Sequence, residues 1–549
     1  MKRSFSILFL TFAIALSVGA QSVRITPAER KLASAISADQ LRDYLYFVAS
    51  DAMEGRDTPS RGLDVTAEFL KMNLSRWGFK PAGDNGTFFQ KIELTVEGID
   101  AVNNILQIDN RNFNLNTDFF RLRGNGSANA LMVFAGHGWV ARSKNIDAYK
   151  GVDVRGRIVV LMGEGFPNPT TLTPNPANVT DADLAGKKGT DWSDPVTYAT
   201  MNGAAGIILI GSPQLQSSWG GLRRFYSGGS MYPTKFRPTP SETESKLPVA
   251  LVSNAVADTI FAGASAGKDS PTPFTIDKTV SITTMGRRET RWTQNVVALW
   301  EGSHPVLKNE MVAVGAHYDH VGTNPNAQGE DKIWNGADDD GSGTVAVLSI
   351  AEALSKSRVH PKRSILLVWH AGEEKGLWGA EYFNKFPTVD IKNVIAQLNI
   401  DMIGRSLDPN NVIKCDQPRK RCNENLTKAN EIYVIGSEMM SSTLGAITKE
   451  TNNAFLNLGY NYKYDDPNDT ERFFFRSDHF HYAQNGIPIA FWFDGVHEDY
   501  HQPSDHADKI DYVKMEKVTR TIFLTMWELS DLRERPKIDK QLPPELTRH

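Results

Sequence analysis

The sequence predicts an α/β fold with a mostly parallel central sheet, helices on both faces and a small β-rich insert. Two observations predict this architecture. From about Asn295 onward, apolar strand segments alternate with helical segments, which is typical of a parallel sheet covered by helices. Between residues 128 and 262, short apolar runs are separated by segments rich in Pro, Gly, Ser, Thr and Asn, which is typical of a strand-rich unit.

The composition is that of a folded protein and gives no reason to propose a nucleic-acid binder. The chain has 549 residues, of which 40% are hydrophobic and 23% are charged. This balance excludes a wholly disordered chain and allows a sizeable core. Sixty basic residues against 64 acidic residues give a formal net charge of −4. Such a charge offers no attraction to a nucleic-acid backbone.

The first 20 residues have the features of a secretory signal peptide. Lys2 and Arg3 precede an apolar run over 5–18, and Gly19 and Ala20 supply the small residues of a cleavage site. The run is short for a bilayer span, which needs ~20 residues, and no later stretch is long enough. We therefore expect a periplasmic or extracellular protein without a membrane span. Export permits a disulfide between Cys415 and Cys422, but the sequence leaves their pairing open.

The chain order predicts five parts. They are a signal peptide at 1–20, an N-terminal segment at 21–127 that belongs with the main domain, the insert at 128–262, the main domain at 263–533 and a polar tail at 534–549. In the N-terminal part, the hydrophobic periodicity predicts helices over Leu41–Asp51 and Gly62–Trp77. In the insert, apolar runs predict strands over Leu131–Ala135, Arg157–Met162 and Gly206–Ile210, with a helix over Val196–Gly203.

The sequence predicts that strands and helices alternate in the main domain. The predicted strands are Val296–Trp300, Met311–Ala316, Ser364–Trp369, Val394–Ile400, Ile432–Ile435 and Pro488–Phe493. The predicted helices are Thr344–Lys356, Leu377–Lys385, Asp478–Gln484 and Tyr512–Ser530. Because ligands of open α/β sheets bind beyond the carboxyl ends of the strands, residues at those ends are the first candidates for a site.

Five segments place a possible metal ligand near a strand end or a helix start. His317 follows a strand directly, and Asp319 can orient its imidazole. Three carboxylates at 338–340 precede a helix, where the alternative is an acidic helix start. Glu373 and Glu374 suit a general base beside a ligand, or again a helix start. Asp401 follows a strand as a cap or a ligand, and His501 follows the last strand after a loop.

Taken together, these segments resemble the secreted zinc aminopeptidase family, which also includes glutamate carboxypeptidases, the transferrin receptor ectodomain and glutaminyl cyclases. The resemblance covers most of the chain. The segment 78–84 looks like the N-terminal segment of that family. The segments 149–160 and 203–209 look like its protease-associated insert. The resemblance implies a three-layer zinc-exopeptidase domain that holds two Zn²⁺ ions.

The resemblance also implies a role for each candidate. Asp339 matches the bridging carboxylate, because it lies three residues before Ser342 in the Asp-x-x-Ser-Gly pattern. His317 and Asp401 would complete one zinc site, and Glu374 and His501 would complete the other. Glu373 matches the general base, and Tyr500 is the candidate donor to the oxyanion. The family further implies a cis peptide bond between Asp339 and Asp340.

The expected function is a zinc-dependent exopeptidase that removes N-terminal residues from peptides. A water bridging two zinc ions would attack the scissile bond, with Glu373 as its base. A metallocarboxypeptidase or dipeptidase on the same site is the alternative enzyme, and a glutaminyl cyclase is a weaker one. A receptor that has lost catalysis is the alternative from another class, and it predicts broken ligands. Side-chain preference, oligomeric state and the metal used in the cell stay open.

Other polar residues near these motifs are interpreted as structural. They are His320, His479, His481, His497 and the triplet Ser477-Asp478-His479, whose adjacent members cannot converge as a catalytic triad. Arg405 and Arg476 can bind a substrate carboxylate, but solvated or structural arginines are the commoner case.

Overall fold

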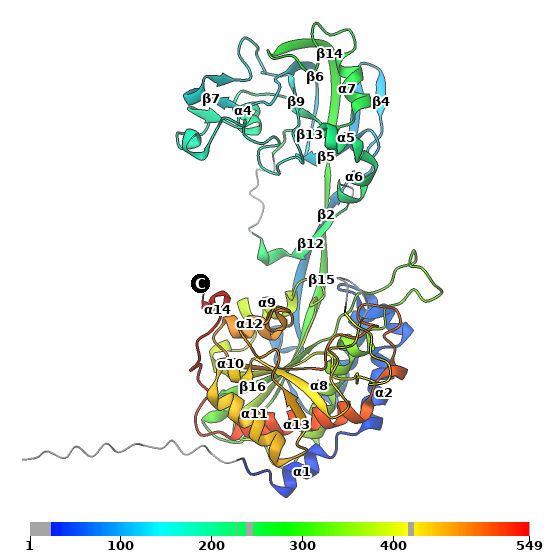
Figure 1. Cartoon of the computed structure of the whole chain (residues 1–549), viewed down its shortest axis with the longest axis vertical. Helices are drawn as coiled ribbons and strands as arrows, with labels where there is room; N and C mark the ends of the chain where they lie inside the picture. The colour runs from blue at the N-terminus through cyan, green and yellow to red at the C-terminus, as the bar shows by residue number, and fades with distance from the viewer. Residues whose placement is uncertain (1–22, 227, 238–244, 416–421, 548–549) are drawn as a thin grey trace, which may run out of the picture. The chain divides into compact units, whose positions relative to one another are not determined.

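The computed structural model describes residues 23–226, 228–237, 245–415 and 422–547 and divides the chain into two units (Figure 1). Unit 1 consists of Met1–Ile92 and Trp292–His549, and unit 2 consists of Glu93–Arg291. The signal peptide expected at 1–20 lies outside the described residues. Among the residues that are described, no helix is long and apolar enough to cross a membrane.

Unit 1 contains a mixed sheet whose centre is parallel. Its order is β2 (Phe89–Ile99), β15 (Gly286–Trp300), β17 (Ser364–His370), β16 (Met311–His317), β18 (Val394–Ile400), β21 (Ile489–Phe493), β19 (Glu431–Ile435) and β20 (Gly459–Asn461), with β1 (Lys80–Pro81) beside β15. The four strands β17, β16, β18 and β21 run parallel to one another. On either side of them, β15 is antiparallel to β17 and β19 is antiparallel to β21. The carboxyl ends of the four central strands therefore meet at one edge.

The central strands form because their apolar runs are buried on both faces. In β16, Val312, Val314 and Ala316 face one hydrophobic core, whereas Met311 and Ala313 face the other. This alternation follows from the two-residue period of a strand. Runs of this kind are typical of strands covered by helices on both sides.

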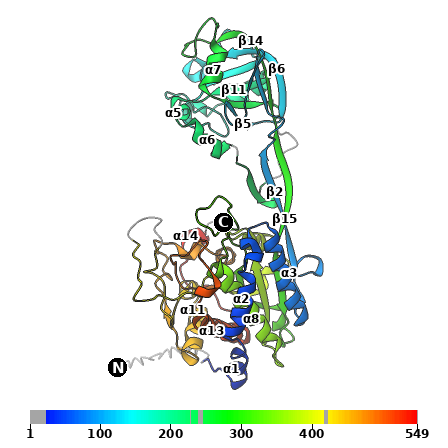
Figure 2. The same ribbon diagram turned by 90° about the vertical axis from the view of Figure 1, so that its right-hand side faces the viewer.

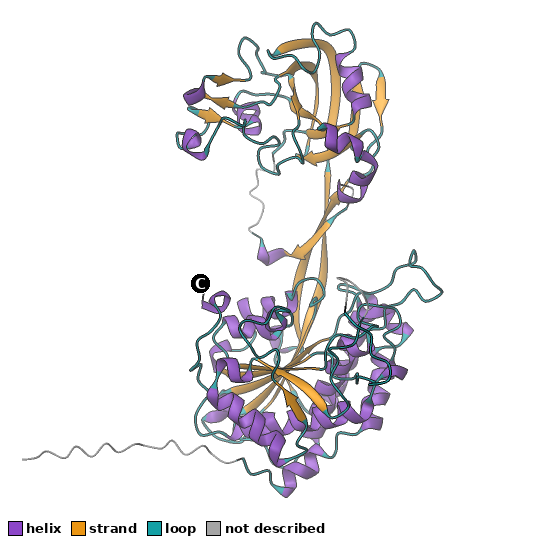
Figure 3. Cartoon of the chain, viewed as in Figure 1, coloured by secondary structure: helices purple, strands orange, loops and turns teal. Residues whose placement is uncertain are grey.

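Helices cover both faces of this sheet (Figure 3). They are α1 (Pro27–Ala33), α2 (Ala38–Val48), α3 (Arg61–Arg76), α8 (Gly343–Ser355), α9 (Trp378–Lys385), α10 (Ser437–Met440), α11 (Ser442–Ala454), α12 (His479–Gln484), α13 (Tyr512–Asp531) and α14 (Pro544–Thr547). The first core is shared by α2, α3, α8 and α13, and the second by α9, α10 and α12. Figure 2 shows α2 and α8 side by side, in agreement with their contacts.

The helices and strands predicted for the main domain are confirmed with small differences at their ends, except that the strand predicted over Val296–Trp300 begins much earlier, at Gly286. The helix expected over Leu41–Asp51 begins earlier, at Ala38, because the Ser37 side chain accepts a hydrogen bond from the Gln40 N–H and caps it. It ends at Val48, and a short 3₁₀ segment, η1 (Asp51–Arg56), follows. Helix α11 was not predicted, because its many polar residues make its apolar face hard to recognise in the sequence.

Unit 2 is built around a second mixed sheet. Its order is β4 (Arg111–Phe113), β3 (Ile105–Ile108), β14 (Phe274–Thr284), β6 (Gly126–Phe134), β9 (Ile158–Met162), β11 (Gly206–Ile210), β13 (Val249–Val252) and β5 (Phe119–Arg123). A smaller sheet contains β10 (Trp192–Ser193), β7 (Val140–Ala141) and β8 (Ile146–Asp147), and β12 (Ser230–Pro233) pairs with β2. The helices are α4 (Pro195–Met201), α5 (Pro213–Ser217), α6 (Trp219–Tyr226) and α7 (Asn254–Phe261).

Unit 2 is wider at both ends than the insert expected at 128–262. The short strands β3, β4 and β5 lie before residue 128, and β14 lies after residue 262, yet all four belong to the sheet that contains β6. Polar residues interrupt the apolar pattern in these strands, as in Arg111–Phe113, so hydrophobicity alone did not reveal them. That unit 2 is a protease-associated domain stays a prediction.

Cys415 and Cys422 form a disulfide bond, which settles the pairing that the sequence left open. The expected cis peptide bond between Asp339 and Asp340 is also present.

Candidate metal centre

The candidate ligands come together at the carboxyl edge of the four parallel strands. His317 is the last residue of β16, and Asp401 directly follows β18. Glu373 and Glu374 lie three and four residues beyond His370, the last residue of β17. Asp339 lies in the η7 turn (Ala337–Ser342), which leads into α8. The parallel register of the strands therefore gathers side chains that are far apart in the sequence.

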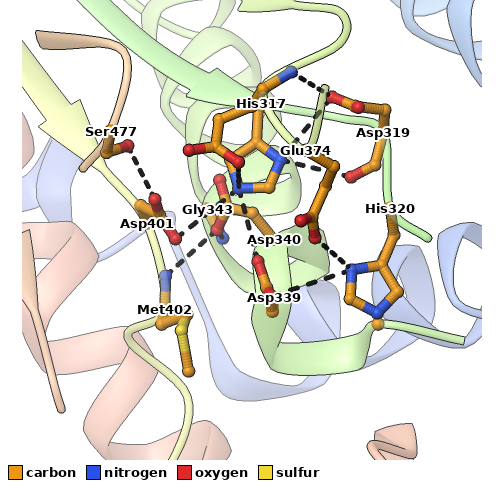
Figure 4. Close-up of polar contacts among 12 residues, drawn as sticks. His317, Asp319, His320, Asp339, Asp340, Gly343, Glu374, Asp401, Met402 and Ser477 are labelled. Atoms are coloured by element: carbon orange, nitrogen blue, oxygen red, sulfur yellow. Dashed lines mark hydrogen bonds and ion pairs between the residues drawn. The ribbon is translucent and has the colours of Figure 1, made fainter. Parts of the chain in front are cut away.

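One set of side chains consists of His317, Asp339 and Asp401 (Figure 4). The Nε2 atom of His317 lies 3.4 Å from Oδ1 of Asp339 and 3.6 Å from Oδ1 of Asp401. Ligands bonded to one tetrahedral zinc at ~2.0–2.2 Å are separated by about 3.3–3.6 Å. The spacing of this set fits a single bound metal ion.

A second set consists of His501, Asp339 and Glu374. The Nε2 atom of His501 lies 3.1 Å from Oδ2 of Asp339 and 3.0 Å from Oε2 of Glu374. Asp339 thus presents one oxygen to each set. A carboxylate placed between two groups of ligands in this way suits a bridge between two metal ions.

Unsatisfied buried atoms support a metal site at this position. His317 Nε2, Asp339 Oδ2, Glu374 Oε1 and His501 Nε2 are buried and form no well-oriented hydrogen bond within the described residues, although charged groups lie close to them. Buried polar atoms without well-oriented partners are rare and costly, and a bound ion is one of the known explanations for them. Imidazole nitrogens with carboxylate oxygens form a donor set that zinc accepts. The residues present therefore fit the zinc that the sequence analysis expects.

The electrostatics of the cluster also favour a bound cation. Burial raises the pKa of Glu373 well above its ordinary value, and burial likewise raises the pKa of Asp401. Burial opposes a charge on His501, but Asp339 and Glu374 outweigh it and raise the pKa of His501 to about 10. Asp339 and Glu374 therefore favour the protonated form of the His501 imidazole, whose protons balance the carboxylates. A metal ion would take over this role and release those protons.

Asp319 contacts both His317 and the segment that carries Glu373. Its Oδ1 accepts a hydrogen bond of 3.1 Å from the Glu373 N–H. The Nδ1 atom of His317 lies 3.2 Å from the main-chain oxygen of Asp319 and 3.7 Å from its carboxylate. Asp319 was expected to orient His317 through its carboxylate. Its main-chain oxygen lies closer to the imidazole, and its carboxylate instead accepts the hydrogen bond from the Glu373 N–H.

Glu373 and Tyr500 lie in one pocket beside the two sets. Both line this pocket together with Asp339 and Asp401. The carboxylate of Glu373 lies 4.0 Å from His317 Nε2. The ring of Tyr500 stacks on that of His501, with centroids 4.0 Å apart, and burial raises the pKa of its hydroxyl well above the ordinary value. Tyr500 therefore stays protonated and can donate a hydrogen bond.

The side chains of His320 and Asp340 also lie close to the ligand sets, although neither was predicted to be a ligand. The Nδ1 atom of His320 lies 2.9 Å from Oε1 of Glu374 and 3.8 Å from Oδ2 of Asp339. Asp340 lies close to His317 and Asp401, but its Oδ1 accepts hydrogen bonds from the N–H groups of Gly343 and Met402. The only feature of the sequence that indicated a role for His320 near the site is its position three residues after His317.

Ser477 belongs to the site as a support for Asp401. Its hydroxyl donates a hydrogen bond of 2.6 Å to Asp401 Oδ2, and it accepts one of 2.9 Å from the Asn399 side chain. The neighbouring Asp478 lies 3.3 Å from His370 Nδ1. The triplet at 477–479 is therefore not a catalytic triad. Ser477 instead holds the Asp401 carboxylate in the orientation that presents Oδ1 to His317.

The substitution Ser477→Ala is expected to weaken zinc binding at the His317–Asp401 set by about 10–100-fold, because partners that orient a ligand typically contribute this much. Zinc affinity would be measured by competition with a chelator. Ser406→Ala is the matched control, because Ser406 donates a similar 2.7 Å bond to Asp511, away from the ligands. Equal affinities for the two variants would contradict this role of Ser477.

Arg56 connects the N-terminal segment, through hydrogen bonds, to two loops that carry candidate ligands. Its side chain is fully buried and donates hydrogen bonds to the main-chain oxygens of Val48, Tyr318, Asn335 and Gly336. The preceding Gly55 has a φ of +65°, and a Cβ there would lie within 2.5 Å of the oxygens of Gly322 and Trp334. The turn at 53–57 thus contacts the loops that carry the candidate ligands.

Arg405 is engaged in a buried network. Its guanidinium lies 3.0 Å from Asp499 and 3.2 Å from His497 Nδ1, and His497 Nε2 lies 3.3 Å from Asp338. These contacts give both Arg405 and His497 a structural role. Asp505 extends the network, because its Oδ2 accepts hydrogen bonds from the N–H groups of Asp338 and Asp339.

Part of the chain is similar to known peptidases. Residues 295–526 match the model of peptidase family M28. "Leupeptin-inactivating enzyme 1" of Streptomyces exfoliatus is 27% identical over 216 residues, which cover 39% of this chain and 38% of that protein. A "probable leucine aminopeptidase" of Arthroderma benhamiae is 29% identical over 234 residues, covering 41% and 56%. The chain thus spans about half the length of these relatives or less.

Solved structures were compared as well. An aminopeptidase from Aneurinibacillus sp. strain AM-1 aligns with a TM-score of 0.43 at 16% identity, covering 94% of this chain and 99% of that one. The zinc aminopeptidase BSAP from Bacillus subtilis aligns with a TM-score of 0.43 at 15% identity, covering 92% and 97%. The family match covers the strands, turns and helices that carry every candidate ligand. Through residues 295–526, which are less than half of its length, the chain is similar to peptidase family M28.

Proposed function

We propose that this protein is an exported zinc exopeptidase, and specifically an aminopeptidase that releases N-terminal residues from peptides. The observation that carries the proposal is the arrangement of two ligand sets that share Asp339, one oxygen to each. Two zinc ions would be held there, one by His317, Asp339 and Asp401 and the other by Asp339, Glu374 and His501.

Zinc bound at these positions would supply a Lewis acid and a water of lowered pKa. The protein itself contributes the proton transfers. Glu373 lines the pocket and is held through its main chain by Asp319, so its carboxylate can take a proton from water and hand it to the leaving amine. Tyr500 lines the same pocket and can donate a hydrogen bond to the oxyanion as it develops.

Two features favour cleavage at the amino end. The pocket is rich in carboxylates, which attract the free ammonium group of a peptide. The rest of its wall includes Met402, Phe491, Phe493 and Val496, which suit an apolar first side chain. The relatives named as leucine aminopeptidases are consistent with such a preference.

Three parts of the proposal concern the rest of the chain. Residues 1–20 would direct export to the periplasm or the outside of the cell. Unit 2 would be a protease-associated insert in the catalytic domain. The partner of the site would be a peptide, with no nucleic acid involved.

Mass spectrometry of a peptide and its N-acetylated twin, each incubated with the zinc-loaded protein, tests the proposal. We expect a ladder that loses one residue at a time from the free amino end and is absent for the acetylated twin. The protein after chelator treatment serves as the control. Loss from the carboxyl end, or release of dipeptides, would overturn the aminopeptidase assignment. Two bound zinc ions with no cleavage would contradict the enzymatic function.

A further inference from the structure

The pocket beside the ligand sets contains a cation that the proposed mechanism does not use. One side of the pocket carries Asp339, Glu373 and Asp401, and the other is aromatic and includes Phe473 and Phe491. Arg476 lies at this wall, and it is the only lysine or arginine lining the pocket among the described residues. It follows η9 (Phe473–Phe475), the short 3₁₀ helix that supplies part of the aromatic wall.

Arg476 has no acidic partner. The centre of its guanidinium lies 4.6 Å from the centroid of the Phe473 ring. Within the described parts of the chain, no carboxylate forms an ion pair with it, although the carboxylates of the ligand sets line the same pocket. The exposed side chain therefore presents its donors to the pocket and to solvent.

The other arginines near the site are already engaged. Arg405 contacts Asp499 at 3.0 Å, and Arg56 donates to four main-chain oxygens, among them those of Tyr318 and Asn335. Arg472, at the other end of η9, also lies over an aromatic ring, that of Phe475, but it is paired with Glu545 at 3.4 Å. Arg476 thus differs from its neighbours in facing the pocket without a partner.

A guanidinium carries a planar fork of donors that matches a carboxylate, and stacking on an aromatic ring restricts its orientation. The charge is also partly shielded from water by the ring, which strengthens its attraction to an anion. The carboxylates of the pocket point toward the histidines of the two ligand sets. A carboxylate that pairs with Arg476 must therefore come from the substrate.

We propose that Arg476 binds a carboxylate of the peptide substrate and so favours peptides with a negative charge close to the scissile bond. This inference rests on the proposed peptidase function and deepens it. The carboxylate has two sources, the α-carboxylate of a short peptide or the side chain of an acidic residue. Both present the same group to the same guanidinium.

Four substrates distinguish the sources. They are Leu-Gly and its amide, and the amides of Leu-Asp and Leu-Asn. We expect kcat/KM to be about tenfold or more higher for at least one charged peptide than for its neutral twin, as for a hydrogen bond to a charged group. A preference for Leu-Gly over its amide identifies the α-carboxylate. A preference for Leu-Asp amide over Leu-Asn amide identifies the side chain.

Variants of the protein then connect the preference to Arg476. In Arg476→Gln the ratio of charged to neutral substrate should fall to about one, and Arg476→Lys should keep part of it, because a lysine retains the charge but not the fork. Arg472→Gln is the matched control and should keep the full ratio. Calorimetric binding of the same four peptides to Glu373→Gln, with and without Arg476→Gln, gives a readout that needs no turnover.

The outcomes separate the two claims. Cleavage of all four peptides with both ratios near one, or ratios that survive in Arg476→Gln, would overturn the inference and leave the peptidase function standing. Failure to cleave any of them with zinc bound would contradict the peptidase function. In that case the calorimetric comparison still decides whether Arg476 recognises a carboxylate.

Discussion

Replacing Glu373 by glutamine is expected to lower kcat by about 10²–10⁴-fold while both metal ions stay bound, because general acid–base catalysis contributes rate factors of this size. The amide has nearly the same shape as the carboxylate but cannot accept a proton. Glu373 belongs to neither ligand set, and its carboxylate lies 4.0 Å from His317 Nε2. Its loss should therefore affect the chemistry and spare the metal.

The measurement combines steady-state kinetics on a leucyl peptide with metal analysis of the same preparation. Glu381→Gln is a matched control, since Glu381 lies on α9 and pairs with Lys385, away from the pocket. It should have the activity and metal content of the unchanged protein. A Glu373→Gln protein that retains turnover would remove the assignment of the base. One that loses metal would instead make Glu373 a ligand.

Asp339→Asn is expected to reduce bound zinc from two ions to fewer than one per chain and to abolish turnover. Asp339 Oδ1 lies 3.4 Å from His317 Nε2, and Oδ2 lies 3.1 Å from His501 Nε2. An asparagine keeps one oxygen, turns a donor group toward the other set and removes the negative charge. Because even partners that only orient a ligand contribute about 10–100-fold in affinity, the loss of a shared ligand should exceed this.

Metal content after dialysis against zinc-free buffer, measured by mass spectrometry of the elements, provides the test. Asp331→Asn is the control, because Asp331 is an exposed residue that pairs with His506 rather than with either set. His501→Ala should lose one ion and keep the other. If Asp339→Asn retains two zinc ions, Asp339 is not shared between the sets and the two-metal arrangement is wrong.

The strands and the types of side chain at the site could be predicted because both depend on short segments of the sequence. The runs that became β16, β17 and β18 are mostly apolar, since helices cover both faces, and a polar residue stands at or directly after the end of each, namely His317, His370 and Asp401. Residue type at a strand end is therefore enough to suggest His317 and Asp401 as candidates. Their assignment to two metal sites came from the resemblance to a family.

The wider extent of unit 2 was hidden for the opposite reason. Its outer strands, such as Arg111–Phe113 and Phe119–Arg123, contain polar residues and are short. Pairing with a distant strand, not local hydrophobicity, makes them part of the sheet. The pairing of two distant strands is hard to predict from a single sequence, because the partners are far apart along the chain.

The amino-acid sequence alone was enough to predict the central strands and most helices of the main domain, the edge of the sheet where a site would lie, and the kinds of side chain available there. Only the tertiary structure decided how the oxygens of Asp339 divide between His317 and His501, and that Ser477 supports a ligand. It also decided which arginine stays unpaired, Arg476 rather than Arg405. The physical reason is that periodicity and residue type reflect local burial, whereas partners and orientation depend on packing between segments that are distant in the chain.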